Sequence, residues 1–411
     1  MSTTSRTVLT VEEYLAELLA DLLDGGPIAD TEEVALTRAL GRVLARDVTS
    51  AGDVPAFANS AMDGYAVRHT DLATLPATLR VLGDVPAGSS ADPRIAAGEC
   101  VRIMTGAPVP GDADTIVPVE LTDGGTETVT VAEARARGQH VRGAGEDVRA
   151  GDLVVASGTS LTGRHIGAIA AAGAGTVTVR RVPVVAVAAT GDELIAPGGQ
   201  LDRGQIFESN AAHLEATLTE LGVSAHRCEP LADDVDGFSR ALDELAAEVD
   251  LVILTGGVSV GAFDVSRIAL EGSGDGVFRH VRMQPGKPQG WARWRGRTPV
   301  LAFPGNPVSA AISFEVFGRP VIDRLLGRTT PPGAGRAVAA DGWTSPAGRR
   351  QYLPVRLSSD EEGRLLATPN HRRGSASHMV TSLAGADALA VVPEDVDAVA
   401  AGDVVEIRSL T

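Results

Sequence analysis

Lysine is almost absent from this 411-residue chain, and the place where it occurs could bind an anion. Lys287, in the segment MQPGKPQG (283–290), is the only lysine beside 35 arginines. A lysine ammonium is a compact charge on a flexible stem, whereas the guanidinium group of arginine is a wide planar fork. Between two prolines and beside a glycine, the compact charge favours contact with a phosphate-like oxyanion. The alternative is compositional drift toward arginine, with Lys287 as a survivor.

The segment LTGGVSVGAFD (254–264) follows an apolar stretch that is typical of a buried strand. Its glycines let backbone N–H groups approach a ligand, its serine adds a hydroxyl group, and its final aspartate adds a carboxylate. These residues are Gly256, Gly257, Ser259, Gly261 and Asp264. A glycine-rich loop alone is a weak indication of function, so it counts only together with its neighbours.

The segment ATGDEL (189–194) follows another apolar stretch and carries Asp192 and Glu193. Two carboxylates beside an anionic ligand would repel it, so they indicate a divalent cation. An acidic pair at the start of a helix is the alternative interpretation.

The segment FPGNPVSA (303–310) is typical of a helix start that accepts an anion. Asn306 suits the N-cap and Pro307 the first helical position, directly after Pro304 and Gly305. Ordinary helix capping without a ligand is the alternative.

The pattern between residues 183 and 327 predicts where these loops lie. Strand and helix patterns alternate there as a parallel sheet requires. The expected strands are 183–190, 223–228, 250–257, 277–283 and 298–305, and the expected helices are 210–222, 236–249, 264–272 and 307–327. Ligands of open α/β domains bind outside the carboxyl ends of the strands. The four loops are therefore expected around one crevice.

Other parts flank this α/β domain. Helical spacing in 10–23 and 31–45 predicts two helices, and 158–181 predicts a third. Short β-rich pieces with Gly, Pro and Asp between them fill 50–146. After the linker TTPPGAG (329–335), alternating residues predict a small β-barrel or sandwich.

Two segments outside the α/β domain carry acids in unusual surroundings. Asp63 lies in VPAFANSAMDGYAV (54–67), which is too apolar for an ordinary solvent loop and favours a buried or interface position. A plain hairpin is the alternative. Asp147 lies in the glycine-rich RGAGEDVRAG (142–151), which is a weak indication alone.

The composition restricts partners and compartment. The net charge of −17 opposes binding to duplex nucleic acid or to an anionic membrane. Cys100 and Cys228 have no metal-ligand spacing and predict neither a disulfide framework nor a zinc site. The acidic N-terminus is unlike a secretory or transit peptide, and no apolar run reaches the roughly 18 residues of a membrane span. A cytoplasmic protein is expected.

Eight ordered motifs resemble the molybdopterin molybdenumtransferase family, which includes the molybdenum-inserting domain of gephyrin. They are SAMDGYA, IMTGAPVP, GED, TGDEL, SN before a helix, TGGVSVGAFD, QPGKP and FPGNPVSA, and they span nearly the whole chain. The resemblance implies a multidomain α/β plus β fold. Its parts are an elongated helical linking domain (1–49 and 147–182), a mostly-β domain with SAMDGYA (50–146), an open α/β molybdopterin-binding domain (183–328) and a C-terminal β-barrel-like domain (329–411).

The resemblance also implies an activity. Family members take adenylylated molybdopterin and molybdate, cleave the adenylate in a Mg²⁺-dependent step, and yield molybdenum cofactor and AMP. The implied active site lies between the α/β domain of one subunit of a homodimer and the SAMDGYA domain of the other. The molybdopterin adenylyltransferase and cofactor-accepting enzymes are further expected partners.

The resemblance assigns site residues by position. The catalytic positions are Asp63, Glu193, Asp264 and Lys287, with Glu193 and Asp264 as expected Mg²⁺ ligands. Further matching positions, expected to bind substrate, are Thr105, Asp147, Asp233, Arg349 and Ser375. The match at Asp233 is less secure, because Asp234 is adjacent to it. Arg349 and Ser375 lie in segments with looser similarity to the family. The loop residues expected to bind substrate are Gly256, Gly257, Ser259, Pro304, Gly305 and Asn306.

One position departs from the family pattern. Many members have a lysine where this chain has Gln284, which leaves more of the oxyanion binding to Lys287 and the nearby Arg282. Molybdate and the pterin phosphates are anions that an acidic protein must attract locally.

Two other functions stay open. Related α/β domains make the adenylylated substrate, so an adenylyltransferase is one alternative; the long flanking domains count against it. A non-catalytic cofactor carrier or scaffold, which would use the same crevice for binding alone, is the other.

Overall fold

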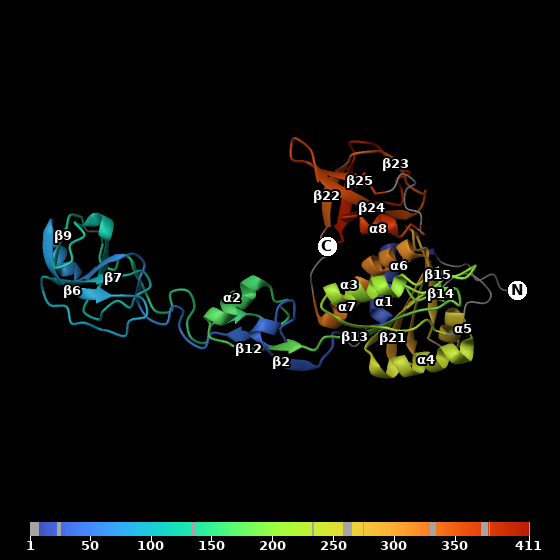
Figure 1. Ribbon diagram of the computed structural model, residues 1–411, viewed down its shortest axis with the longest axis horizontal. Coiled ribbons are helices and arrows are strands. Elements are labelled where there is room, and N and C mark those ends of the chain that lie inside the picture. Colours follow the sequence, from blue (N-terminus) through green and yellow to red (C-terminus); the bar gives the residue numbers. More distant parts are fainter. Residues whose placement is uncertain are drawn as a thin grey trace. The chain divides into compact units, whose positions relative to one another are not determined.

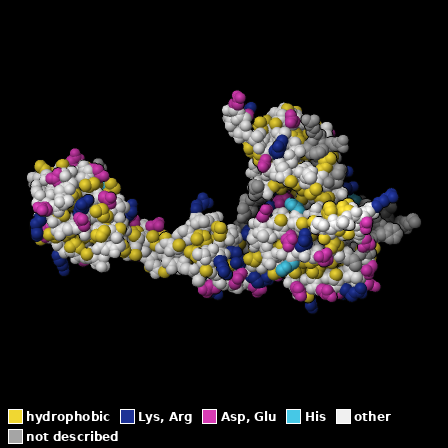
Figure 2. Space-filling model, viewed as in Figure 1, with side chains coloured by type: hydrophobic (Ala, Val, Ile, Leu, Met, Phe, Trp, Pro, Cys, Tyr) yellow, Lys and Arg dark blue, Asp and Glu magenta, His cyan; other side chains and the backbone are white. Residues whose placement is uncertain are grey.

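The chain forms two units, which are described separately. The computed structural model describes residues 8–22, 26–133, 136–231, 234–257, 265–273, 275–328, 334–370, 377 and 379–410. Unit 1 comprises residues 1–31 and 180–411, and unit 2 comprises residues 32–179 (Figure 1). On the face drawn in Figure 2, acidic and basic side chains are interspersed over both units.

A seven-stranded sheet forms the centre of the α/β part of unit 1, in the order β1-β18-β20-β21-β17-β13-β16. Its strands are β1 (Val8–Leu9), β13 (Val184–Ala189), β16 (Ser224–Arg227), β17 (Leu251–Thr255), β18 (Val277–Val281), β20 (Pro288–Trp294) and β21 (Thr298–Phe303). β20 runs antiparallel to both neighbours, and the other pairs are parallel. β17 is buried along its whole length, which explains its continuous apolar run.

Helices cover both faces of this sheet, as the alternating pattern predicted (Figure 1). α4 (Val235–Glu248) and α5 (Val265–Gly272) lie on one face, where Phe238 and Leu270 join the buried core of β13, β17 and β21. The other face carries α1 (Val11–Leu22), α3 (Asn210–Glu220), α6 (Pro307–Ser313) and α7 (Arg319–Leu326). The open α/β domain is therefore confirmed.

The first helix belongs to unit 1, which corrects the grouping of residues 1–49 with 147–182. The apolar side of α1 is buried, and the ring of Tyr14 meets the edge of Phe317 with 4.7 Å between centroids. Glu17 on the same helix pairs with Arg279 of β18. Hydrophobic burial thus holds α1 against the α/β sheet. The other boundaries of the four expected domains stay a prediction.

The long helix expected over 307–327 is interrupted. Between α6 and α7, residues Phe314–Gly318 form a π-helical turn. Pro320, at the start of α7, has no N–H to donate to the preceding turn, which explains the widened helix there. A Cβ at Gly318 would lie 2.6 Å from a ring carbon of Phe314, so glycine is required at this close approach.

Strand β20 was not predicted from the sequence. Its Pro288 and Gly290 look like strand breakers. In the sheet, a Cβ at Gly290 would lie 2.5 Å from a ring atom of Phe278 on β18, so the glycine makes room for a cross-strand ring. The segment 285–287, which we call the Lys287 loop, therefore leads directly into a central strand.

The C-terminal part of unit 1 is a closed five-stranded barrel, as the β-barrel-like prediction required. Its strands are β22 (Ala334–Ala339), β24 (Arg350–Ser359), β25 (Leu365–Pro369), β26 (Ala388–Val392) and β28 (Val404–Ser409). They pair in the order β24-β25-β22-β28-β26, and β26 pairs back to β24. β19 (Met283–Gln284) adds to β24 in parallel, so the Lys287 loop begins on the barrel.

Shorter elements complete unit 1. They are β14 (Leu194–Ile195), β15 (Ile206–Phe207), β23 (Trp343–Thr344), α8 (Thr381–Ala384) and β27 (Ala398–Val399). No helix of the described residues is long and apolar enough to cross a membrane.

Unit 2 contains the predicted mostly-β region. A five-stranded sheet has the order β8-β5-β7-β6-β9. Its strands are β5 (Gly64–Val67), β6 (Ala77–Val85), β7 (Glu99–Ile103), β8 (Thr115–Pro118) and β9 (Thr128–Val131), and β4 (Asn59–Ser60) pairs with β10 (Val141–Arg142) beside it. Short 3-10 turns at His69–Leu72 and Val119–Leu121 connect strands.

The rest of unit 2 contains one of the two helices expected there. α2 (Gly163–Ala171) lies in the predicted segment 158–181. The other strands are β2 (Thr31–Ala35), β3 (Val48–Thr49), β11 (Leu153–Val155) and β12 (Thr176–Arg180), paired as β12-β2 and β11-β3.

The prediction of a helix over 31–45 was wrong. That segment is β2 followed by one 3-10 turn at Leu36–Arg38. Gly41 has a φ of +75°, which no α-helix contains. Leu36 and Leu44 are buried with Ile169 of α2, so packing in this small core overrides the helical spacing.

Candidate functional site

Three loops of unit 1 touch one another at the carboxyl ends of their strands. They follow β13, β17 and β21, and we call Thr190–Glu193, Gly256–Gly257 and Pro304–Asn306 the loop cluster. The Gly256 N–H donates to Phe303 O at 3.0 Å. Gly256 has a φ of +93°, and a Cβ there would lie 2.8 Å from Thr190 O. Glycine is thus needed because the loops meet through backbone atoms.

Gly305, in the loop that follows β21, also lies close to Gly256. A Cβ at Gly305 would lie 3.3 Å from Gly256 Cα. Asn210, at the start of α3, donates from Nδ2 to Gly305 O at 2.7 Å, and its Oδ1 is buried without a hydrogen-bond partner among the described residues. Asn210 was absent from the predicted site residues, although the SN motif before a helix pointed to it.

Glu193 presents its carboxylate at the loop cluster. Its side chain folds over Gly191, where a Cβ would lie 2.5 Å from Glu193 Oε2. Its backbone is fixed, because Ile206 N donates to Glu193 O at 2.8 Å next to the β14–β15 pair. The carboxylate is exposed and makes no ion pair with a described residue.

Asn306 occupies the N-cap of α6 and Pro307 its first turn, as predicted. The Asn306 side chain does not cap the helix; its Nδ2 donates to Ser377 Oγ at 3.1 Å. Val308 N donates to Ser377 O at 3.0 Å. Ser377, from the C-terminal part, thus contacts the helix start at which the sequence predicted anion binding.

Lys287 is fixed through its backbone. Val281 N donates to Lys287 O at 2.8 Å, and the preceding Gly286 has a φ of +96°. The side chain is half-buried, and its ammonium makes no ion pair or hydrogen bond within the part of the chain that the structure describes.

Two arginines lie along the same segment. Arg349 donates from Nη1 to Gln284 Oε1 at 3.0 Å. The backbone of Arg282 joins two elements, because its N–H donates to Leu9 O at 2.8 Å and its carbonyl accepts from Arg350 N at 2.9 Å. The Arg282 side chain is exposed. The neutral amide of Gln284 therefore holds a guanidinium group where a lysine would repel it.

Unit 2 brings Asp63 and Thr105 into hydrogen-bond contact, and their predicted roles stay predictions. The Asp63 carboxylate accepts from the Thr105 N–H at 2.6 Å and from the Thr105 hydroxyl at 2.8 Å. These bonds, the backbone one first, hold the pKa of Asp63 below its ordinary value. A Cβ at Gly64 would lie 2.0 Å from Val117 O, so the turn is built directly on strand β8.

Asp147 lies in the same unit without touching Asp63. Its N–H donates to Val54 O at 3.0 Å, and its side chain is exposed. Ala61 N donates to His140 O at 2.8 Å, which connects the Asp63 turn to the segment before Asp147. No hydrogen bond joins the two carboxylates directly among the residues described for unit 2.

Four predicted site residues lie outside the described residues: Asp233, Ser259, Asp264 and Ser375. Their predicted roles stay predictions. Among the residues that are described, no group of three His, Cys, Asp or Glu side chains gathers as a metal site.

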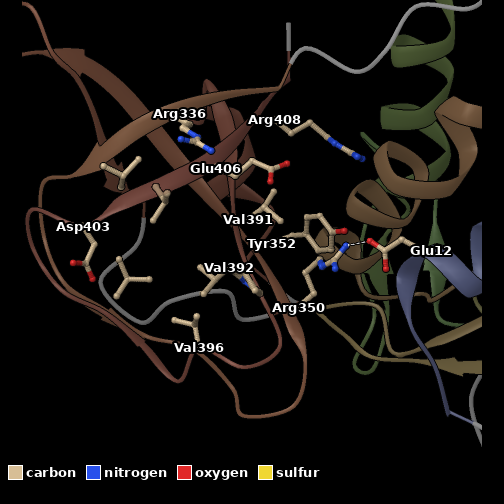
Figure 3. Close-up of a pocket in the computed structure, with 14 residues that line it drawn as sticks. Glu12, Arg336, Arg350, Tyr352, Val391, Val392, Val396, Asp403, Glu406 and Arg408 are labelled. Atoms are coloured by element: carbon tan, nitrogen blue, oxygen red, sulfur yellow. Dashed lines mark hydrogen bonds and ion pairs between the residues drawn. The ribbon is translucent and has the colours of Figure 1, made fainter.

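A groove of about 830 Å³ is lined by none of the predicted site residues (Figure 3). It runs over the outer face of the barrel, past Tyr352 and Val391, to Glu12 of α1. Arg350 pairs there with Glu12 and Glu394. The basic groups that line the groove are thus partly neutralised by acids within unit 1.

Three family profiles match consecutive parts of the chain. "MoeA N-terminal region (domain I and II)" matches residues 9–173, "Probable molybdopterin binding domain" matches 186–324, and "MoeA C-terminal region (domain IV)" matches 336–410. The loop cluster and Lys287 lie within the second match, and Asp63 and Thr105 lie within the first.

Curated proteins and solved structures resemble the chain over nearly its full length. Molybdopterin molybdenumtransferase 2 of Mycobacterium tuberculosis is 42% identical over 389 residues, which are 92% of this chain and 95% of that protein. The molybdopterin molybdenumtransferase of Bacillus subtilis is 34% identical over 398 residues, covering 94% and 91%. A crystal structure of the molybdopterin biosynthesis moeA protein from Pyrococcus horikoshii superposes with a TM-score of 0.83 at 27% identity, covering 98% of this chain and 100% of that one.

Proposed function

Since this chain belongs to the family of molybdopterin molybdenumtransferases, we propose that it moves molybdenum from molybdate onto adenylylated molybdopterin and releases AMP. It is a transferase of molybdenum cofactor biosynthesis. The adenylylated form of the substrate, the Mg²⁺ requirement, the homodimer, the cytoplasmic location and the roles of single residues are the parts that we propose.

One observation carries the proposal: Lys287 and Arg349 make no ion pair with a described residue, and Lys287 directly precedes β20, which pairs with the end of β21 through Gly290 and Ala302. Arg349 is held by a neutral amide. Because the chain has a net charge of −17, anions are attracted only where such cations are concentrated. This arrangement supports binding of molybdate or of a pterin phosphate.

The loop cluster supports a role in holding the pterin substrate. Its glycines let ligand atoms approach the backbone, as Gly256 already lets Thr190 approach. Gly257 has a φ of +68°, so it also suits close backbone contact. Asn210 Oδ1, which has no hydrogen-bond partner among the described residues, is a further acceptor at the same place. Fixed polar groups of this kind orient a ligand without reorganisation.

The donor set at the loop cluster fits Mg²⁺. This ion is usually held by one or two carboxylates together with waters and substrate phosphates, and Glu193 supplies an exposed carboxylate. We expect Glu193 to hold the ion, with Asp264 as the second protein ligand. The bound ion would offset negative charge on the phosphoanhydride.

Asp63 is proposed to act from the partner subunit of a homodimer. Its carboxylate is fixed by Thr105, and Phe57 and Met62 of the same segment (54–67) are exposed apolar side chains. Exposed apolar groups around a fixed acid are typical of a surface that is covered in an assembly. Light scattering at micromolar concentration tests the dimer, and a monomer would contradict it.

A complementation experiment tests whether the site is shared between subunits. Asp63→Ala and Glu193→Ala chains are co-expressed and purified together, and each is also purified alone. If each site uses Asp63 of one subunit and Glu193 of the other, a mixed dimer keeps one of its two sites intact. Random pairing makes about half of all dimers mixed, so about a quarter of the wild-type activity should return. No recovery in verified mixed dimers would contradict the shared site.

The activity itself is tested by mixing purified protein with adenylylated molybdopterin, molybdate and Mg²⁺. We expect AMP release that requires both molybdate and Mg²⁺, together with a cofactor that activates an apo-molybdoenzyme. Tight pterin binding without AMP release would support the carrier or scaffold function instead. Formation of adenylylated molybdopterin from ATP and molybdopterin would support the adenylyltransferase.

A further inference from the structure

A buried amide lies directly beneath the Lys287 loop. Gln289, in β20, is completely buried. Its Nε2 donates to Gly286 O at 2.7 Å and to Ser313 Oγ at 2.6 Å, and Ser313 at the end of α6 is also completely buried. The amide therefore joins the loop to the helix that follows the loop cluster.

The loop backbone rests closely on this pair. A Cβ at Gly286 would lie 3.1 Å from Ser313 Oγ and 3.2 Å from Gln289 Nε2, and the φ of +96° suits glycine alone. On the other side, Lys287 O accepts from Val281 N at 2.8 Å. The two residues before Pro288 are thus fixed from both sides, which leaves mainly the lysine side chain to move.

Stability alone gives a poor reason for glutamine at this position. The Gln289 Oε1 is buried without a hydrogen-bond partner among the described residues. A buried polar atom without a partner costs folding free energy, which offsets part of the stability that the two donated hydrogen bonds contribute. Of the two polar atoms of the amide, only Nε2 has hydrogen-bond partners among the described residues. One of these two acceptors, Gly286 O, belongs to the Lys287 loop.

We propose that Gln289 is a positioning residue, which holds the Gly286 carbonyl and thereby directs the Lys287 ammonium toward the bound oxyanion. This inference rests on the proposed function, because it needs Lys287 to contact molybdate or a substrate phosphate. Ser313 supports the amide from the helix side. Gln289 touches no substrate, so its effect must pass through Lys287.

The test is a double-mutant cycle of Gln289→Met and Lys287→Ala in the full-length protein, with initial rates of AMP release measured against molybdate concentration. Methionine keeps the length of the side chain and removes the donor. We expect Gln289→Met to raise the molybdate KM about tenfold and to leave kcat nearly unchanged, because a misdirected cation weakens binding of the anion. In the Lys287→Ala background, the same substitution should have no further effect.

Two further variants separate positioning from general damage. Ser313→Ala, which removes one partner of the amide, should raise the molybdate KM less than Gln289→Met. Gln351→Met is the matched control: Gln351 is also buried, but its Oε1 accepts from Trp343 Nε1 at 3.1 Å, so its loss should lower the Tm and leave the molybdate KM unchanged.

The outcomes distinguish the inference from the function on which it rests. A Lys287→Ala enzyme with wild-type molybdate KM would overturn both the role of Lys287 and this inference. A weakened Lys287→Ala enzyme, together with a Gln289→Met enzyme of wild-type KM, would overturn the inference alone. An equal effect of Gln289→Met with and without Lys287 would also overturn it, since the amide would then act by another route.

Discussion

Asp63 in unit 2 and Lys287 in unit 1 are both charged residues on loops, but the fold holds them in opposite ways. The Asp63 carboxylate itself is held by the N–H and the hydroxyl of Thr105. For Lys287 the backbone is held, through Val281 N, while the ammonium has no hydrogen-bond or ion-pair partner among the described residues. The fold thus fixes the charged group itself in Asp63, but only the backbone that carries it in Lys287.

The difference leads us to expect different roles for the two residues in the proposed reaction. An anion held by neutral donors keeps its charge and its position, so Asp63 suits a role in orientation. An unpartnered cation gains most when an oxyanion replaces its hydration, so Lys287 suits a role in affinity. Substitutions at four positions test this contrast, and they are arranged from the largest expected effect to the smallest.

Gly64→Ala should have the largest effect, on the stability of unit 2. The new Cβ would lie 2.0 Å from Val117 O, inside the β5–β8 pair, so the sheet must open. We expect the free energy of unfolding to fall by about 3 kcal/mol, the upper end of the usual cost of overpacking. Urea unfolding monitored by circular dichroism measures it.

Gly52→Ala is the control for that substitution. Nothing lies within 4 Å of a Cβ at Gly52, and its φ is not in the left-handed region. Its stability should therefore stay within about 0.5 kcal/mol of the wild type. A Gly64→Ala protein as stable as the Gly52→Ala protein would show that the Asp63 turn is not built on strand β8.

Glu193→Gln tests the acid of unit 1. The substitution keeps the shape of the exposed side chain and removes its charge, so a cation at the loop cluster loses a ligand. We expect Mg²⁺-dependent AMP release to slow roughly 100-fold, which is about 2.7 kcal/mol in activation free energy. Pterin binding, followed by fluorescence, should change much less.

Asp192→Asn is the matched control for Glu193→Gln, since Asp192 is the exposed neighbouring acid. It should keep most of the AMP release. Equal losses of pterin binding and AMP release in Glu193→Gln would assign Glu193 to substrate contact and would contradict its role as a metal ligand.

Lys287→Ala and Lys287→Arg test the cation. A charge-assisted contact contributes about 1.5–3 kcal/mol, so the alanine variant should bind molybdate roughly ten- to a hundredfold more weakly. Arginine keeps the charge, but its planar fork has to fit between Pro285 and Pro288, so we expect poor rescue. Molybdate-dependent AMP release by both variants is the measurement.

The Lys287 pair also decides between function and composition. If the single lysine is a remnant of drift toward arginine, both variants should behave like the wild type. Full activity of Lys287→Ala would therefore contradict the proposed anion contact. The thermal unfolding of both variants should match the wild type, because the ammonium makes no ion pair or hydrogen bond with a described residue.

The sequence could predict features that depend on neighbouring residues, but not those that depend on distant ones. The alternation over 183–327 and the β-rich pattern of 50–146 predicted both sheets, because each strand shows its burial in its own residues. Helical spacing failed over 31–45, where Gly41 needs a left-handed φ and Leu36 packs into a small core. Strand β20 was missed because the reason for its Gly290, the ring of Phe278, lies on another strand.

Within the site, local motifs were predictable and long-range partners were not. The Asp63 turn and the N-cap at Asn306 follow from neighbouring residues. The partners Ser377 for Asn306 and Arg349 for Gln284 are separated from them by 71 and 65 positions, and no local pattern records such a pairing. Nor could a pattern show that Gln289 would be completely buried.

Thr105→Val should have the smallest effect, and it tests whether Asp63 is fixed by its hydrogen bonds. Valine removes the hydroxyl donor at 2.8 Å and keeps the N–H donor at 2.6 Å. The pKa of Asp63 should therefore rise toward its ordinary value without reaching it, because the backbone bond is the largest cause of the lowering. A titration of the Asp63 carboxyl carbon by NMR measures the change, and Thr128→Val, on an exposed position of β9, is the control.

The sign of the stability change follows from the lowered pKa. A carboxyl whose folded-state pKa is depressed stabilises the fold above its unfolded-state pKa, about 3.9 for aspartate, and that contribution is lost as the pH falls through the folded-state value. Thr105→Val should thus unfold slightly more easily than the wild type near neutral pH, and the gap should close in acid. If the pKa of Asp63 were the same in both proteins, the hydroxyl would not hold the carboxylate, and Asp63 would be as free of side-chain partners as Lys287.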